Sequence, residues 1–259
     1  MLLALDIGNT SIHVGVFAEE TLQGCFSLGA DTARTADEYA LLLHAMAEMH
    51  EISYREITQV ILGSVLPSLT GILTAAVGKL THAPVTVVGP GIKTGFPLRL
   101  DDPSELGADL AANTAGALRR FGAPVLIVDC GTATTVSAVD RDGAFVGCVI
   151  RPGVGMSLSA LHNTGLLPDV IADAPLHSIG KNSTDSIRIG VVRGEALAIE
   201  GFLQADRNEL QLSESTPVVL TGGYANLILP YLTTAAHLLP HLTLEGLCAI
   251  ARTNSRRRR

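Results

Sequence analysis

LALDIGNTSIHVGVF (residues 3–17) and LIVDCGTATTVSAVD (residues 126–140) are two versions of one pattern. They align without a gap when the chain is shifted by 123 residues, which places Asp6 over Asp129. In both, an apolar run stops at a carboxylate, continues through a glycine and small polar residues, and then resumes. This pattern is typical of a β-hairpin. Its recurrence predicts that the fold is built from two related halves.

Further matches extend the repeat on both sides of the hairpin. Gly8 falls on Gly131, and the Gly24-Cys25 pair falls on Gly147-Cys148. A second internal similarity relates VILGS at 60–64 to VVLTGG at 218–223, each of which is an apolar run that leads into small residues. We therefore predict two similar halves that divide near Gly122, covering residues 1–121 and 122–259.

Apolar periodicity alternates between the periods of strands and helices along the chain, which indicates an α/β architecture with much parallel sheet. Strands are expected at 2–5, 12–17, 60–62, 85–88, 125–128, 135–139, 145–150 and 218–220, and helices at 36–50, 67–81, 107–120, 186–203, 224–236 and 243–252.

The composition is that of a compact globular protein and argues against nucleic-acid binding. Of 259 residues, 47% are hydrophobic and 17% are charged, with a formal net charge of −7. The chain has no tryptophan and few other aromatic residues, so a base-stacking surface is not expected. The one basic run, Arg256 to Arg259, is typical of a solvated terminus.

Cysteine usage and hydropathy indicate a cytoplasmic protein. The four cysteines show no CxxC spacing, and we expect small buried hydrophobic residues in a reducing compartment rather than a zinc site. The N-terminus has no basic region ahead of its apolar run, and no apolar run approaches the ~20 residues of a membrane-spanning helix. We expect no membrane association.

The two hairpin turns are candidates for phosphate binding. Small residues let backbone N–H groups approach a phosphate, and Asn9 and Thr10 add side-chain donors. A carboxylate beside them can orient hydrated Mg²⁺, which takes only one or two protein carboxylates. A plain structural turn explains either stretch alone, but the recurrence in register favours a nucleotide cleft between the two turns. No GxxxxGK[ST] motif is present.

A longer series of motifs makes the sequence resemble one family, the type III pantothenate kinases of the acetate and sugar kinase, Hsp70 and actin superfamily. The resemblance covers nearly the whole chain and implies a duplicated actin-like (ribonuclease H-like) fold with two similar halves around a nucleotide cleft. Its motifs are DIGNT (6–10), DDPSELGADL (101–110), DCGTATT (129–135), IRPG (150–153), ALHNTGLLP (160–168), GKNSTDSIRIG (180–190) and TGGYA (221–225).

The resemblance implies a phosphotransferase that uses ATP with Mg²⁺ and a monovalent cation, K⁺ or NH₄⁺. The reaction would convert pantothenate to 4′-phosphopantothenate, the first step of coenzyme A biosynthesis. A homodimer is implied as well, because one substrate contact in this family crosses the subunit interface.

The resemblance also implies roles for individual residues. Asp109 corresponds to the proposed general base, and Asp129 to the aspartate that binds the monovalent cation. The Thr184 position reaches pantothenate across the dimer interface. The implied ATP-binding residues are Asp6, Ile7, Gly8, Asn9, Thr10, Ser11, Ile12, His13 and Thr132, and the implied substrate-binding residues are Leu100, Gly107, Ala108, Asp109, Leu110 and Thr184.

The residues themselves permit simpler interpretations of some of these positions. Asp109 is also an acidic residue in the first turn of a predicted helix, where the helix dipole favours it. The segment that begins at Thr184 is expected to cap the helix that follows. Asp101 and Asp102 are better explained as a polar loop than as a metal site. Thr221-Gly222-Gly223 fits either adenosine binding or a strand-to-helix turn.

Three departures from the family pattern cluster around the acceptor. Leu110 stands where the family usually has arginine, Leu100 where it has tyrosine, and Asp102 where it has asparagine. Arg99, Arg151 and Lys181 are candidates to compensate for the lost positive charge. Three hypotheses therefore stay open: a pantothenate kinase with an altered acceptor pocket, a kinase for another small alcohol, and a nucleotide-binding paralogue with a regulatory role.

Overall fold

The computed structural model describes residues 1–255, so the arginine run at 256–259 lies outside the described residues. Contacts between residues divide the chain into two compact units. Unit 1 comprises Met1–Pro97, Asp101–Arg119 and the segment that begins at Leu242, and unit 2 comprises Leu98–Leu100 and Arg120–His241.

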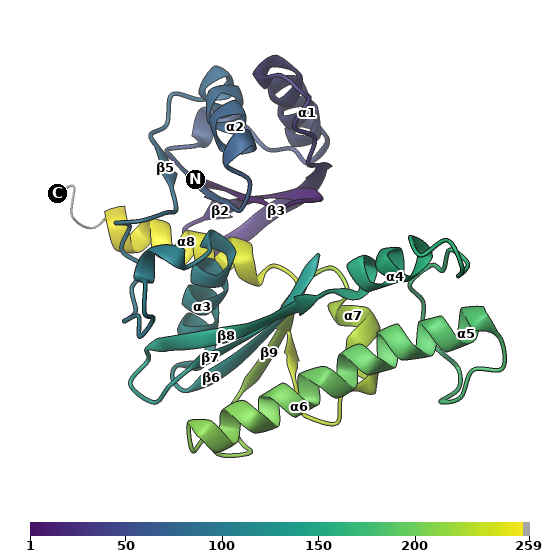
Figure 1. Cartoon of the computed structure of the whole chain (residues 1–259). Coiled ribbons are helices and arrows are strands. Elements are labelled where there is room, and N and C mark those ends of the chain that lie inside the picture. The colour runs from purple at the N-terminus through teal and green to yellow at the C-terminus, as the bar shows by residue number, and fades with distance from the viewer. Residues whose placement is uncertain (256–259) are drawn as a thin grey trace. The chain divides into compact units, whose positions relative to one another are not determined.

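Unit 1 is a five-stranded sheet with helices on both faces, as Figure 1 shows. One face packs on α1 and α2, and the other on α3 and α8. Its strands are β1 (Leu2–Ile7), β2 (Ser11–Ala18), β3 (Thr21–Gly29), β4 (Gln59–Ser64) and β5 (Val85–Val87), and its helices are α1 (Ala36–Met49), α2 (Pro67–Leu80), α3 (Ala108–Phe121) and α8 (Leu242–Ser255).

Unit 2 is built on a second five-stranded sheet. Helices α5 and α6 are joined by a π-helical turn, Ile189–Arg193, and Figure 1 shows them as one long rod along the sheet. The strands are β6 (Val125–Cys130), β7 (Ala133–Val139), β8 (Phe145–Pro152), β9 (Val218–Thr221) and β10 (His237–Leu238), and the helices are α4 (Val154–His162), α5 (Ser183–Arg188), α6 (Gly194–Glu209) and α7 (Ala225–Ile228).

The two sheets have the same topology, which confirms the predicted duplication. The strand orders are β3-β2-β1-β4-β5 and β10-β9-β6-β7-β8, so each antiparallel hairpin extends into two parallel strands. Even local hydrogen bonds repeat. Val65 N donates to Ile7 O at 3.1 Å, and Tyr224 N donates to Cys130 O at 3.0 Å. Ile7 and Cys130 are 123 residues apart, the offset found in the sequence.

The final helix does not lie with the half in which the sequence places it. The predicted second half ends at residue 259, whereas the contacts assign α8 to unit 1. Two glycines explain this. A Cβ on Gly246 would overlap Ala112 O, and a Cβ on Gly116 would lie 2.9 Å from Leu242 O, so the α3 and α8 backbones touch. The chain therefore returns to its first sheet.

Other expectations differ from the structure in detail. The helix predicted at 224–236 is limited to α7 and a 3-10 turn at Leu229–Tyr231, because Pro230 cannot continue an α-helix. Helix α4 had no counterpart among the predicted elements. Cys148 is exposed and Cys25 is half-buried, so the expectation of four buried cysteines holds only for Cys130 and Cys248.

Within residues 1–255, no helix combines the length and the apolar character that crossing a bilayer requires.

Candidate functional site

The first turn, defined as Asp6–Ser11, joins β1 to β2 in unit 1. Gly8 N donates to Ser11 O at 2.9 Å, which closes the turn and leaves Asn9 and Thr10 exposed. The side chains of Ile7 and Ile12 are fully buried. Of the predicted ATP-binding residues, these two can therefore contribute only backbone groups. Among the polar ones in this unit, Asn9, Thr10 and His13 are exposed, and Asp6 and Ser11 are half-buried.

A row of polar residues crosses the sheet beside the first turn. Asp6 pairs in register with His13, and His13 with Ser27 on β3. The His13 Nδ1 and Ser27 Oγ lie 2.7 Å apart, within hydrogen-bonding distance. Side chains in register share one face of a sheet. His13 is thus held between an aspartate and a serine.

Asp109, the predicted base, is the second residue of α3. Its side chain folds back over Gly107, where an added Cβ would lie 2.5 Å from the Asp109 Oδ1. Ala108 is buried and sits 3.7 Å from the Cβ position of Gly63 on β4. Asp109 is half-buried, and the two small residues that precede it, Gly107 and Ala108, leave its carboxylate accessible.

Asp102 caps a short 3-10 helix, Pro103–Glu105. Its Oδ1 accepts hydrogen bonds from Ser104 N at 2.8 Å and from Ser104 Oγ at 2.7 Å. These bonds lower the pKa of Asp102, so the side chain remains an anion. The loop interpretation of this residue is supported, since the carboxylate performs the capping role that an asparagine performs equally well.

The second turn, defined as Asp129–Ala133, joins β6 to β7 in unit 2. Asp129 is half-buried, and its Oδ1 occupies space that two glycines leave open. A Cβ on Gly131 would lie 3.4 Å from that oxygen, and a Cβ on Gly222 would overlap it. Gly222 has φ +95°, a conformation that other residues rarely adopt. The carboxylate is thus enclosed by backbone on both sides.

Helix α4 begins directly against this second turn. Gly153 N donates to Thr132 O at 3.0 Å. A Cβ on Gly153 would lie 2.6 Å from the same oxygen, so only glycine permits this approach. Thr132 itself is exposed. The turn carries an exposed threonine on a closely packed backbone, which suits contact with a phosphate.

Leu100 ends a three-residue segment that belongs to unit 2. Arg99 N donates to Phe145 O at 2.9 Å, and the Arg99 guanidinium binds Asp140 and, at 2.6 Å, Asp142. These carboxylates raise the pKa of Arg99. Because two anions already neutralise it, Arg99 is a poor candidate to replace the missing substrate-binding charge.

Thr184 lies within the first turn of α5 and is half-buried. The N-cap is Asn182, whose Oδ1 accepts from Asp185 N at 2.8 Å, so the prediction of a cap that begins at Thr184 is wrong. Asparagine is as good a cap as threonine and comes first in the chain. Lys181, the next candidate cation, is exposed beside it.

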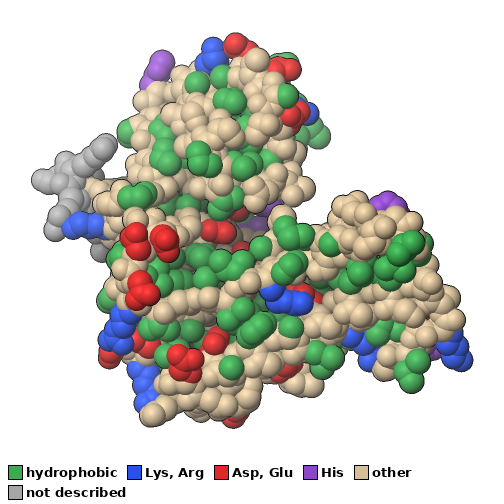
Figure 2. Space-filling model, in the orientation of Figure 1, with side chains coloured by type: hydrophobic (Ala, Val, Ile, Leu, Met, Phe, Trp, Pro, Cys, Tyr) green, Lys and Arg blue, Asp and Glu red, His purple; other side chains and the backbone are tan. Residues whose placement is uncertain are grey.

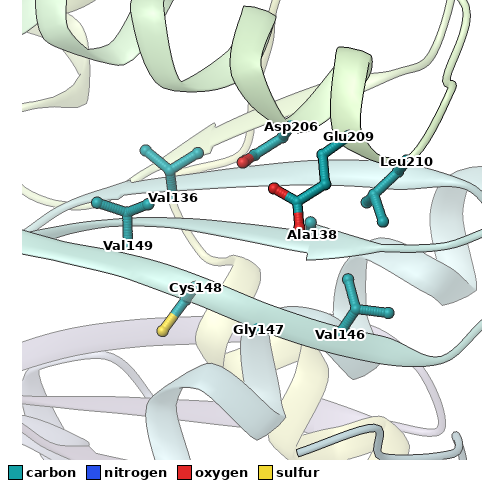
Figure 3. A pocket seen from close by; sticks show the side chains of 9 residues that line it. All are labelled: Val136, Ala138, Val146, Gly147, Cys148, Val149, Asp206, Glu209 and Leu210. Atoms are coloured by element: carbon teal, nitrogen blue, oxygen red, sulfur yellow. The ribbon is translucent and has the colours of Figure 1, made fainter.

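A hollow of about 230 Å³ lies elsewhere in unit 2, between β7, β8 and the end of α6. Figure 3 shows the carboxylates of Asp206 and Glu209 directed towards its apolar floor. Burial, and then the charge of Glu209, raises the pKa of Asp206. None of the predicted site residues lines this hollow.

Comparison with known proteins places these features in a family. The profile described as "Type III pantothenate kinase" matches residues 2–205. The chain is 39% identical to the type III pantothenate kinase of Moorella thermoacetica over 257 residues, covering 98% of this chain and all of the relative. The corresponding protein of Roseiflexus sp. is 38% identical, with 98% and 99% covered. This chain belongs to the type III pantothenate kinase family.

Solved structures support the fold of this type III pantothenate kinase family member. A protein described as a conserved putative Baf family transcriptional activator from Campylobacter jejuni aligns with TM-score 0.61 at 18% identity, covering 98% of this chain and 99% of that one. Component A of the (R)-2-hydroxyglutaryl-CoA dehydratase of Acidaminococcus fermentans aligns with TM-score 0.57 at 13% identity, covering 96% and 95%. The predicted duplicated actin-like fold is confirmed.

The departures from the usual type III pantothenate kinase pattern are distributed over both units. Leu110 and Asp102 lie in unit 1, whereas Leu100 lies in unit 2. Leu110 is half-buried beside Asp109 and offers no hydrogen-bond donor. No lysine or arginine lies in the first turn of α3 to supply the positive charge that the resemblance predicts at this position.

Sequence reasoning missed two residues of this type III pantothenate kinase. In the sequence, Gly153 is only the last residue of the IRPG motif, and Gly222 belongs to a segment that fits either adenosine binding or a turn. Their importance comes from close approach to the second turn, which no local pattern reveals. The only sequence signal is that both glycines lie two or three residues after the end of a predicted strand.

Proposed function

We propose that this protein phosphorylates pantothenate with ATP, producing 4′-phosphopantothenate for coenzyme A biosynthesis. The observation that carries the proposal is the pair of matched turns with Asp6 and Asp129, in a chain aligned from end to end with pantothenate kinases. Phosphoryl transfer asks mainly for positioning and charge neutralisation, and matched phosphate turns supply both.

The proposed roles in unit 1 follow from local geometry. The exposed polar groups of the first turn bind ATP phosphates, and Asp6 orients the hydrated Mg²⁺ that accompanies ATP. Asp109 accepts the proton of the acceptor hydroxyl. A solvent-accessible carboxylate held over Gly107 is available to act as a general base.

The proposed roles in unit 2 concern phosphate and a cation. Thr132 contacts ATP phosphate, and Asp129 binds a monovalent cation, K⁺ or NH₄⁺. Support comes from the Asp129 carboxylate, a hard oxygen ligand whose Oδ1 lies in the space that Gly131 and Gly222 leave open beside the turn. When bound, the cation offsets negative charge on the phosphates.

We further propose that the active protein is a homodimer that forms through unit 2. Large apolar side chains are exposed along the segment between α4 and α5, and Figure 2 shows hydrophobic groups over this part of the surface. An exposed apolar patch of this kind marks an interaction surface. Thr184 is the second residue of α5, which directly follows this segment, and it contacts pantothenate from the partner subunit. The most exposed members are Leu166, Ile171, Leu176 and Ile179.

A coupled assay of ADP release, with and without pantothenate, tests the proposal. We expect pantothenate-dependent turnover, with kcat lowered by about 100-fold or more in Asp109→Asn, because the proton acceptor is lost. Leu110→Arg is the matched gain-of-function variant, and its KM for pantothenate should fall about tenfold as a charged contact is restored. Turnover with another alcohol but not with pantothenate would refute the proposed acceptor.

A further inference from the structure

Glu195, the second residue of α6, is a buried charge with no role in the site described above. It is only 1% exposed. Its Oε2 binds the Arg151 guanidinium, and its Oε1 has no hydrogen-bond partner within residues 1–255. Burying a carboxylate is strongly unfavourable unless it is well paired. Only one of the two Glu195 carboxylate oxygens is paired, so stabilisation of the fold alone does not explain why this residue is buried.

The ion pair lies beside the second turn. Arg151 on β8 pairs in register with Thr134, and Thr134 pairs with Cys130. These three side chains therefore form a row on one face of the sheet. Burial chiefly raises the pKa of the Cys130 thiol, and the charges of Asp129, Glu195 and Arg151 also act on it. Cys130 is the residue between Asp129 and the glycine of the turn.

The backbone connects this pair to the predicted phosphate contact. Arg151 is two residues before Gly153, whose N–H donates to Thr132 O. On the other side, Glu195 follows the π-helical turn at Ile189–Arg193. Such turns insert an extra residue and are frequent at functional sites. The end of β8 is thus held from α6 on one side and against the second turn on the other.

We propose that Glu195 is a positioning residue for nucleotide binding. It fixes Arg151, and through Arg151 it holds Pro152 and Gly153 against the backbone of Thr132. The second turn then keeps the geometry that a phosphate requires without having to be ordered on binding. The inference rests on the proposed contact between Thr132 and ATP.

The test compares Glu195→Gln, Arg151→Gln and the double variant in the full-length protein. The dissociation constant for ADP is measured by calorimetry, together with KM for ATP and kcat. We expect each single variant to weaken ADP binding about tenfold, as loss of one charge-assisted hydrogen bond implies. The double variant should bind within about twofold of the singles, because residues that act as one unit are not additive.

Glu200→Gln is the matched control on the same helix. Glu200 accepts hydrogen bonds from Thr233 N at 2.6 Å and Thr234 N at 2.8 Å, away from the second turn. Its loss should lower the thermal midpoint and leave ADP binding unchanged. A purely structural role for Glu195 predicts the same result for Glu195→Gln, so unchanged ADP binding there overturns the proposal.

Two more variants separate the possible failures. Thr132→Val tests the phosphate contact itself, and normal ADP binding in this variant refutes both that contact and the route proposed for Glu195. If Thr132→Val weakens binding and Glu195→Gln does not, only the positioning role fails. Should Glu195→Gln not fold, Glu195→Asp keeps the charge but shortens its reach. ADP binding by Glu195→Asp as tight as that of the parent protein would then overturn the proposal.

Discussion

The first and second turns occupy the same place in two copies of one topology, yet their surroundings differ. Beside the first turn, Ser64 on β4 pairs in register with Ile7 and carries a side chain. Beside the second, Gly222 follows Thr221, the residue that pairs with Asp129, and approaches the turn with positive φ. One aspartate lies in a polar row open to solvent, and the other is enclosed by backbone.

This difference indicates how a duplicated fold acquires two tasks. The topology fixes where a carboxylate stands, and the neighbouring glycines determine how closely backbone approaches it. An open polar turn suits hydrated Mg²⁺ with phosphate, since Mg²⁺ retains its waters. A carboxylate enclosed between glycines, as at Asp129, suits a less strongly hydrated monovalent ion. The two aspartates are therefore expected to respond differently to the same kind of substitution.

The largest effect is expected when Gly222, the residue beside the second turn, is replaced by serine, the residue type that Ser64 provides beside the first turn. Gly222→Ser places a side chain in left-handed backbone and against Asp129, and it should destabilise unit 2 by about 3 kcal/mol or more and reduce kcat/KM at least 100-fold. The measurements are chemical denaturation and the coupled assay.

The reverse exchange, Ser64→Gly, is the matched control. It loses the hydrogen bonds between Ser64 Oγ and Leu66, at 3.0 and 3.1 Å, and should cost only about 1 kcal/mol. If Gly222→Ser and Ser64→Gly lower stability and kcat/KM equally, the second turn does not depend on close backbone approach more than the first.

Gly153→Ala should have the next largest effect. Its Cβ would press on the carbonyl oxygens of Gly131 and Thr132, so we expect a loss of about 2 kcal/mol in unfolding free energy and weaker ATP binding. Thermal unfolding with and without ADP measures both. Gly201→Ala in α6, where nothing lies within 4 Å of the Cβ, should instead stabilise by about 0.5–1 kcal/mol.

Acid should weaken unit 2 through Glu200. Burial raises its pKa, but hydrogen bonds from Thr234 and Thr233 outweigh this and leave the pKa lowered. The stabilisation is therefore present above the unfolded-state pKa and is lost as pH falls through the folded-state pKa. The thermal midpoint of Glu200→Gln should depend less on pH than that of the parent protein between about pH 3 and 5. Identical pH profiles would exclude this contribution.

The smallest effect is expected at the polar row of unit 1. Ser27→Ala removes the hydrogen bond to His13, and KM for ATP should rise about threefold, since an exposed neutral bond contributes little. In unit 2 the corresponding end of the row is Ile150, opposite Thr135. Ile150→Ser should leave KM for ATP unchanged. If KM for ATP rises about threefold in this variant too, the polar row of unit 1 has no special role in ATP binding.

The sequence alone determined the duplication, because the apolar period and the Asp-x-Gly spacing are local properties repeated at a fixed offset. It also determined most strand positions, the family and the candidate residues, since motif identity needs no coordinates. It placed Asp109 at a helix start for the same reason.

Only the tertiary structure decided what surrounds those residues. The return of α8 to unit 1, the enclosure of Asp129 by Gly222 and the pairing of Arg151 with Glu195 all join segments far apart in the chain. Such contacts depend on how closely backbones approach, and a glycine that permits a contact looks the same in the sequence as a glycine that only turns the chain. The order of residues along the chain determined where the candidate site residues lie in the fold, and tertiary packing determined which groups surround each of them.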